Sequence, residues 1–178
     1  KMRLETDLSV SGFDKLIDEL EKYINDLPKK ATQLTSELAE YGIDVCIENA
    51  NNGYAKYVTF SKETDIQGCK SILVATETGV ITAEWLRNGE VVSADVSPLL
   101  MLEFGYGNEA DNPFAFEGGG QGTFPNQTHA FDPNGWWFQD TDGVWHHFYG
   151  TVPQQPMYEA FCEMQNVIGK IAKRVFGD

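Results

Sequence analysis

The sequence predicts an α+β fold, in which a long kinked N-terminal helix and a C-terminal helix pack on an antiparallel β meander, with an aromatic β-hairpin and a long loop rich in Gly and Asn. Two observations carry this prediction. Apolar residues recur at alternating spacings of three and four near both ends of the chain, whereas residues 54–96 hold short β-rich runs separated by turn residues. The length of 178 residues fits one domain, so we expect a single domain over 1–178.

A helix is predicted over residues 11–49, where Ser11 can serve as the N-cap and Asp14 occupies the capping-box position. The apolar stripe of this helix consists of Ile17, Leu20, Ile24, Leu27, Ala31, Leu34, Leu38, Tyr41 and Val45. Its phase survives Pro28, whereas a turn at that point would leave the phase of the second half arbitrary, so we expect one helix kinked at Pro28. The stripe could form a coiled-coil seam, but we favour packing against a sheet or a neighbouring helix.

The segment 54–96 is predicted to form the antiparallel meander. Its β-rich runs are YAKYVTF, KSILVAT, VITAEWL and EVVSADV, and two of the turns between them are Thr78-Gly79 and Asn88-Gly89. The Asn88-Gly89 pair fits a type I′ hairpin turn, because both central residues of that turn need a positive φ.

A short helix is expected next, over 97–104, with Ser97 as its N-cap, Pro98 at the first helical position and Gly105 at its end. Residues 105–135 then form a long loop without periodicity, and loops of such length are usually functional or disordered. We expect this loop to become ordered against a partner subunit or to fold back over its own sheet. The reason is its unusual content of phenylalanine: Phe114, Phe116, Phe124 and Phe131.

The last helix is predicted over 156–176. Its apolar residues form a narrow seam of Met157, Phe161, Met164, Ile168, Ile171 and Val175. Lys170, Lys173 and Arg174 suit the negative end of the helix dipole, and Gly177 can terminate the helix.

The stretch GWWFQDTDGVWHHFYG predicts a hairpin over 136–149 with Asp140–Gly143 as its loop. If Gln139 faces Val144, one face holds Trp136, Phe138, Trp145, His147 and Tyr149, and the other holds Trp137, Gln139, Val144, His146 and Phe148. Both faces are rich in aromatic residues, which an edge hairpin with one face in water does not need. One face is expected to pack on the core, and the other is then a second core surface, a sugar-binding platform or a subunit interface. We favour an interface, where Trp and Tyr are enriched, and its candidate residues are Trp136, Trp137, Phe138, Trp145, His147 and Tyr149.

The formal net charge of −14 is unevenly distributed along the chain. Residues 88–169 contain eleven acids and no Lys or Arg, and the remainder is close to balance with sixteen acids and thirteen bases. Such a surface repels phosphate backbones, so DNA binding by counterion release is not expected. We favour acidity as a solubility feature, and the alternative is a wall past which nucleic acid moves without adhering.

The three cysteines, Cys46, Cys69 and Cys162, lack the spacing of a disulfide framework or of a Cys-x-x-Cys site and suit a reducing compartment. The chain opens with no secretory leader and contains no apolar run long enough for a membrane span, so neither secretion nor membrane insertion is expected.

Metal and enzyme signatures are weak. The calcium-loop register fails at Asp140 and again at Asp132, since later ligand positions are apolar. His146 and His147 are adjacent on a predicted strand, so they point to opposite faces and cannot share an ion, and nothing places His129 beside either of them. No nucleophile, phosphate-loop or dinucleotide motif fits its required context. We therefore expect a non-enzymatic protein without metal or cofactor.

Two short motifs and the order of the elements resemble a known family. Glu103, Phe104 and Gly105 match a Glu-Phe-Gly-Thr-type segment after the strands, and Gln155, Pro156 and Ala160 match a Gln-Pro-Phe-Leu-x-x-Ala-type start of the last helix. Together with the GFDKLIDELEKY opening, they resemble the head–tail joining proteins of long-tailed phages. These are neck, tail-completion or minor tail components of the gene-product-ten-like family.

This resemblance implies a structural virion protein of phage or prophage origin, located in the virion and, during assembly, in the host bacterial cytoplasm. It implies that the protein self-associates into or onto a ring and contacts other neck and tail proteins, without a membrane partner. DNA would pass through the lumen of the ring and be contacted only non-specifically. Two alternatives remain. One is a carbohydrate-binding module that uses Trp136, Trp137 and Trp145. The other is an unrecognised metal-dependent hydrolase around His129, Asp132, His146 and His147.

Overall fold

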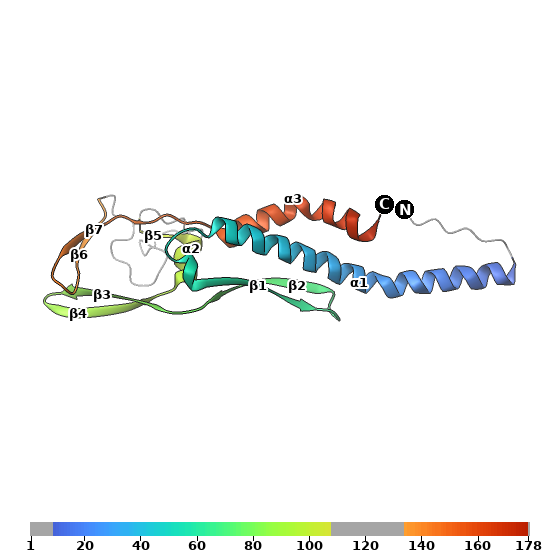
Figure 1. Ribbon diagram of the computed structural model, residues 1–178, viewed down its shortest axis with the longest axis horizontal. Coiled ribbons are helices and arrows are strands. Elements are labelled where there is room, and N and C mark those ends of the chain that lie inside the picture. The colour runs from blue at the N-terminus through green and yellow to red at the C-terminus, as the bar shows by residue number, and fades with distance from the viewer. Residues whose placement is uncertain (1–8, 108–133, 178) are drawn as a thin grey trace, which may run out of the picture. The chain divides into compact units, whose positions relative to one another are not determined.

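The computed structural model of the chain describes residues 9–107 and 134–177 (Figure 1). Its α+β class agrees with the sequence prediction, with a long N-terminal helix, a C-terminal helix and antiparallel strands. The chain forms two compact units. Of the described residues, the helical unit comprises 9–44, 61–74 and 160–177, and the sheet unit comprises 45–60, 75–107 and 134–159.

The first helix, α1 (Val10–Asn49), begins one residue before the predicted cap, Ser11. The side chain of Ser9 accepts a hydrogen bond from the Gly12 N–H at 3.1 Å, and the Ser9 carbonyl accepts the first helical bonds. Ser9 is therefore the N-cap, and the assignment of that role to Ser11 is wrong. Both serines satisfy the residue preference for a cap, and the residue pattern alone does not separate them.

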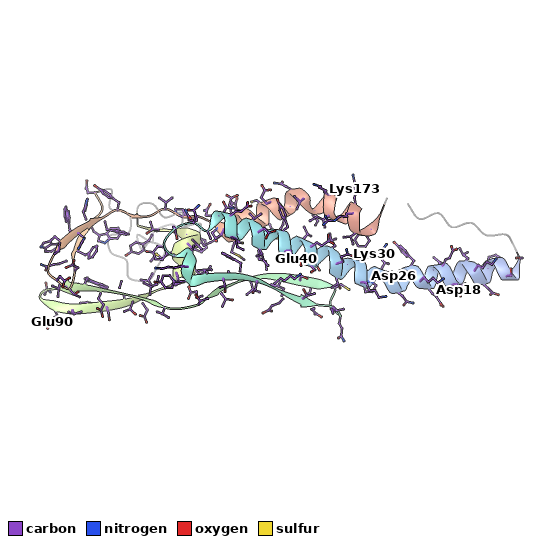
Figure 2. The ribbon with its side chains drawn as sticks, in the orientation of Figure 1. Asp18, Asp26, Lys30, Glu40, Glu90 and Lys173 are labelled. Carbon is purple, nitrogen blue, oxygen red and sulfur yellow. The ribbon has the colours of Figure 1, made fainter. Side chains whose placement is uncertain are left out.

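The helix α1 continues through Pro28, as the unbroken apolar phase predicts. The Thr32 hydroxyl donates to the Pro28 carbonyl at 2.9 Å. The α1 ribbon changes direction close to the labelled side chains of Asp26 and Lys30 (Figure 2). A bend here is expected, because proline removes one helical hydrogen bond and its ring displaces the preceding turn.

In the helical unit, α1 packs between the hairpin of β1 (Val58–Asp65) and β2 (Lys70–Glu77) and the helix α3 (Pro156–Phe176). The elements lie close together at Gly42, where an added Cβ would lie 2.9 Å from the Met164 sulfur and 3.2 Å from Leu73 Cδ2. Ion pairs flank this contact: Lys62 with Glu40, and Arg174 with Glu37. From about Lys30 onward, the apolar stripe of α1 therefore packs against both a sheet and a helix, as we favoured over a free seam. For the first half of the stripe that prediction is wrong, because Ile17, Leu20, Ile24 and Leu27 are exposed.

The sheet unit contains a four-stranded antiparallel sheet in the order β4-β3-β6-β7. Strands β3 (Ile81–Arg87) and β4 (Glu90–Val96) are joined by Asn88 and Gly89, with φ of 54° and 83°. This confirms the predicted two-residue turn with positive φ at both positions. Strand β6 (Trp136–Gln139) pairs with β3 and with β7 (Trp145–Phe148).

The region 54–96 is not one continuous meander, because β1 and β2 form a separate two-stranded sheet. The Thr78 N–H donates to the Tyr57 carbonyl at 2.8 Å, so the chain after β2 stays paired with the residues before β1. Neither Thr78 nor Gly79 has the positive φ that a tight hairpin turn needs. The run predicted to begin at Tyr54 starts with a 3₁₀ turn, η1 (Ala55–Tyr57), and β1 follows it.

The short helix α2 (Pro98–Phe104) forms as predicted. The Ser97 hydroxyl accepts from the Leu100 N–H at 3.2 Å, Pro98 occupies the first turn, and Gly105 ends the helix with φ 67°. The chain then enters β5 (Tyr106–Gly107), which pairs with β8 (Gly150–Thr151). Two residues of the predicted 105–135 loop are thus a strand, because they find a partner some forty residues later in the sequence.

Residues 108–133 of that predicted loop lie outside the described residues, as do its four phenylalanines. The helix α3 has the bounds that the sequence predicts. Within the described residues, no helix combines the length and the apolar character that crossing a membrane requires.

Candidate interaction surface

The hairpin of β6 and β7 is built around the carboxylate of Asp140. One oxygen of this carboxylate accepts from the Val144 N–H at 2.8 Å and from the Asp142 N–H at 3.0 Å, while the Asp140 N–H donates to the Val144 carbonyl at 2.9 Å. Gly143 takes a positive φ of 83°. The loop therefore contains five residues, 140–144, and Gln139 pairs with Trp145.

The predicted register, with Gln139 facing Val144, is consequently wrong by one residue. A slip of one residue exchanges the faces of one strand relative to the other. The observed pairs are Trp136 with Phe148, Trp137 with His147, Phe138 with His146 and Gln139 with Trp145. The aromatic residues of both strands are therefore divided differently from the prediction, although each face remains rich in them.

One side of the hairpin, which we call the outer aromatic face, carries Trp137, Trp145, His147 and Tyr149. The exposed fractions of Trp137 and Trp145 are 62% and 61%, and Tyr149 is exposed as well. The rings support each other: His147 stacks on Trp137 at 4.4 Å between centroids and meets Tyr149 edge-on at 4.4 Å. The face is thus a set of mutually packed rings, of which Trp137, Trp145 and Tyr149 are exposed to water.

The outer aromatic face continues onto neighbouring strands of the same sheet. Leu86 pairs with Gln139 and with Val91, so these residues share the side of the sheet that carries Trp137. Val91 is exposed, and the next outward pairs are polar or acidic, with Glu84 opposite Ser93. A patch of rings bordered by acidic and hydroxyl side chains results, on a hydrogen-bonded sheet that holds it in place.

The opposite side of the hairpin packs within the sheet unit. Tyr106 meets the Trp136 ring edge-on at 5.3 Å, and Trp136 meets Phe148 edge-on at 5.1 Å. Phe138 stacks on His146 at 5.2 Å. The six predicted interface residues therefore divide. Trp137, Trp145, His147 and Tyr149 lie on the outer aromatic face, whereas Trp136 and Phe138 lie on the other.

The two histidines of the hairpin have different partners. The His147 ring donates from Nε2 to the Asn134 carbonyl at 2.7 Å, which fixes the ring between its aromatic neighbours. His146 Nε2 lies 2.6 Å from the Asp140 carboxylate. The hydrogen bond from His146, followed by that from the Val144 N–H, lowers the pKa of Asp140.

The described residues contain no group of three or more His, Cys, Asp or Glu side chains that could hold a metal ion. His146 and His147 lie on opposite faces of β7, as the sequence predicts for neighbours on a strand. The other two residues of the hydrolase alternative, His129 and Asp132, are outside the described residues.

The two family-motif segments meet in space. The buried carboxylate of Glu103, on α2, accepts hydrogen bonds from the Met157 and Tyr158 N–H groups at 3.0 and 2.9 Å. These are two of the first N–H groups of α3, which have no partner inside the helix. Glu103 is thus the cap of α3, provided by another helix, and its negative charge also suits the positive end of the α3 dipole.

The other motif residues complete this junction. Gly105 is buried with φ 67°, and an added Cβ would lie 2.3 Å from the Thr151 carbonyl oxygen. Pro156 is fully buried at the first position of α3, and Gln155 precedes it with a positive φ of 52°. Ala160 is fully buried one turn further along α3, and Phe104 is half-buried at the end of α2. The motif positions therefore have an architectural role in this chain.

Cys46 lies against the same junction, with its sulfur 3.3 Å from the Pro156 carbonyl. Burial, and secondarily the charge of Glu103, raises the pKa of its thiol to about 12. A thiol of this kind is not ionised at neutral pH and cannot act as a nucleophile. The other two cysteines are half-buried.

The sequence pattern missed two contributors to the hairpin. Tyr106, from the predicted loop, packs on Trp136, and the Asn134 carbonyl orients His147. Tyr106 carries no local signal, because its place depends on the pairing of β5 with the distant β8. The Asn134 contact is made across the β6–β7 hairpin, whose register the sequence did not predict correctly. Comparisons of the chain with family models, with curated proteins and with solved structures find no match. The resemblance to the phage family therefore stays a prediction carried by the sequence motifs.

Proposed function

We propose that the chain is a structural, non-enzymatic protein of the phage head–tail junction that assembles into or onto a ring through which DNA passes. The observation that carries the proposal is the outer aromatic face. Trp137, Trp145 and Tyr149 are all exposed on a hydrogen-bonded sheet. Large rings that are ordered and unprotected from water are typical of surfaces that another protein covers.

Two further observations support an assembly role. Glu103 and Gly105, the motif residues that matched the phage family, stabilise the junction of α2 and α3, so the resemblance concerns a structural element. Residues 88–169 carry eleven acids and no Lys or Arg. A surface of that composition repels the DNA backbone, which suits a lumen through which DNA must slide.

The proposal is tested by assembly measurements on the purified protein, alone and with the neck and tail proteins encoded beside its gene. Light scattering and negative-stain microscopy are expected to reveal rings or ring-containing complexes. Replacing Trp137 and Trp145 by Ser should abolish the complexes with neck and tail proteins and leave the circular dichroism spectrum unchanged. A matched control is Ile66→Ser, which removes an exposed apolar side chain from the β1–β2 turn. A protein that joins no neck or tail complex refutes the proposal.

A carbohydrate-binding module is the second candidate, and one observation favours it: Trp137 and Trp145 lie on the same face of the hairpin, diagonally across the two strands. Sugar rings stack on exposed indoles of this kind, although Trp136 lies on the opposite face and could not take part. Titration of tryptophan fluorescence with a broad glycan panel separates the candidates. A saturable change that Trp145→Ser abolishes would support sugar binding over assembly.

A further inference from the structure

The N-terminal half of α1 carries an apolar stripe that no described residue covers. Its members repeat at spacings of four and three, and all of them are exposed: Phe13, Ile17, Leu20, Ile24 and Leu27. Ile17 is 52% exposed and Ile24 is 61% exposed. We call residues 13–27 the arm. A stripe with this spacing forms one continuous ridge on a helix, which fits a groove between other elements.

The helical unit also contains such a groove. It is open to solvent and has a volume of about 530 Å³. Its walls are mainly apolar, formed by Leu38 of α1, Leu73 of β2, and Phe161, Met164 and Ile168 of α3. Phe161 and Ile168 are themselves exposed. The same unit therefore presents an apolar ridge and an apolar groove.

The arm cannot occupy the groove of its own chain. Residues 10–49 form one continuous helix, and Thr35, Leu38 and Ala39 of that helix line the groove. With a rise of 1.5 Å per residue, Ile24 lies about 21 Å along the axis from Leu38. A proline kink bends a helix without reversing it. In Figure 1 the first turns of α1 accordingly extend beyond the β1–β2 hairpin and the end of α3. Only the arm of a second molecule can reach the groove.

Charge favours the same pairing. The arm contains five acids and two lysines. At 100° per residue, Glu21 and Asp14 lie beside one edge of the apolar stripe and Glu19 lies beyond the other edge, whereas Lys15 and Lys22 share the far side with Asp18 and Asp26. The charged residues nearest to the stripe are thus acidic, and the two lysines are the farthest from it. Figure 2 shows Asp18 and Asp26 projecting from the same stretch of helix.

The end of α3 beside the groove is basic. Lys170, Lys173 and Arg174 follow Ile168, and no acid occurs between Ile168 and the end of the helix. Arg174 is paired with Glu37, whereas Lys170 and Lys173 form no ion pair within the described part of the chain. An acidic ridge that enters an apolar groove next to a basic helix end is complementary in both shape and sign.

We propose that the arm of one copy packs into the α1–β2–α3 groove of the next copy. The inference rests on the self-assembly part of the proposed function and names the surfaces that carry it. Because the contact joins two different surfaces, each copy offers one arm and one groove. A head-to-tail contact of this kind closes into a ring when the rotation between copies permits, and otherwise continues as a filament.

The test begins with variants of each surface. The arm variant, Ile17→Asp with Ile24→Asp, places two charges in the apolar stripe. Its control, Ser11→Asp with Asn25→Asp, makes the same charge change at exposed positions of α1 outside the stripe. The groove variant, Ile168→Asp, places a charge in the apolar wall of the groove. Its control is Asn166→Asp on the other side of α3. In sedimentation experiments over a concentration series, the arm and groove variants should each assemble at least about tenfold more weakly than wild type. The two controls should assemble normally.

Mixing the two defective proteins identifies the geometry. The arm variant keeps an intact groove and the groove variant keeps an intact arm, so the mixture should form a one-to-one complex although neither protein assembles alone. An arm-to-arm coiled coil would instead leave the groove variant able to assemble. If Ile168→Asp unfolds the protein, as circular dichroism would reveal, Phe161→Asp replaces it, since that side chain is more than half exposed.

Three results overturn the inference: a wild-type protein that stays monomeric at its highest soluble concentration, a folded groove variant that assembles as well as wild type, or a mixture that forms no complex. None of them refutes the proposed function, which is decided by incorporation into complexes with neck and tail proteins. Conversely, arm-to-groove assembly of a protein that joins no such complex would support the inference and refute the phage role.

Discussion

Replacing Glu103 by Ala removes the carboxylate that caps α3. In the folded protein this buried group accepts from the Met157 and Tyr158 N–H groups at 3.0 and 2.9 Å. Loss of a helix cap costs about 0.5–2 kcal/mol, and a hydrogen bond to a charged group contributes about 1.5–3 kcal/mol. Because the two bonds share one carboxylate at one helix end, we expect a loss of about 2–4 kcal/mol rather than the sum.

The isosteric change Glu103→Gln separates charge from shape. It keeps one acceptor oxygen for one N–H group but loses the charge that suits the α3 dipole, and it turns a donor towards the second N–H group. We expect about half of the loss for Ala, roughly 1–2 kcal/mol. Glu48→Ala is the matched control, because Glu48 is exposed on α1.

The assay is urea denaturation followed by circular dichroism, with thermal melting as a second measurement. For a chain of this size, a loss of 1 kcal/mol lowers Tm by about 2–4 °C, so a loss of about 2–4 kcal/mol in Glu103→Ala should lower it by roughly 4–16 °C. The control should stay within about 0.5 kcal/mol of wild type. A Glu103→Ala protein as stable as the control would refute the capping argument.

Three further predictions concern single sites. Gly105→Ala should destabilise the folded protein by at least about 2 kcal/mol, because φ is 67° and the site lacks room for a Cβ. Gly169→Ala, in the open interior of α3, should instead stabilise it by up to about 1 kcal/mol. Denaturation midpoints that shift in the same direction for both variants would contradict this prediction. Cys46, with a thiol pKa of about 12, should react with iodoacetamide only as fast as the protein unfolds. Labelling of Cys46 in the native protein, detected by peptide mass spectrometry, would refute the burial argument. The pKa of Asp140 is lowered, so its contribution to hairpin stability should be complete above the unfolded value of about 3.9 and be lost as pH falls through the lower folded value. The Val144 amide shift should report that midpoint by NMR, and a midpoint above 3.9 would contradict the hydrogen-bonded loop.

Local patterns predicted the helices well because helical structure is specified by neighbours in sequence. The unbroken phase through Pro28 predicted one helix, and Pro156 and Gly177 predicted the bounds of α3. The N-cap of α1 was misplaced because Ser9 and Ser11 have equal intrinsic preference. The choice depends on which hydroxyl reaches the Gly12 N–H.

The hairpin register failed for a comparable reason. The residues Asp140–Gly143 have the composition of a tight loop, and composition does not count loop residues to within one. The Asp140 carboxylate decides the count by accepting from both Asp142 and Val144, which draws Val144 into the loop. One residue then reassigns Trp137 and Trp145 together to the outer aromatic face.

The sequence pattern did not predict contacts between residues that are far apart in the sequence. The pairing of Leu86 with Gln139 joins segments that are more than fifty residues apart, and the Glu103 cap joins α2 to α3 over a similar separation. No periodicity specifies such partners. The motif match at Glu103 and Pro156 marked both ends of the second contact without indicating that they meet.

The two proposed contacts place different demands on one chain. In a closed ring held by these contacts, every copy has its arm and its groove occupied. Only an open chain leaves an unoccupied arm at one end and an unoccupied groove at the other. The outer aromatic face belongs to the sheet unit and the arm belongs to the helical unit, so the two contacts use different residues. A neck component must bind its own copies and also the next component of the particle. Variants should therefore separate the two tasks: Ile17→Asp with Ile24→Asp should prevent self-assembly, whereas Trp137→Ser with Trp145→Ser should leave arm-to-groove contacts intact while preventing attachment to another protein.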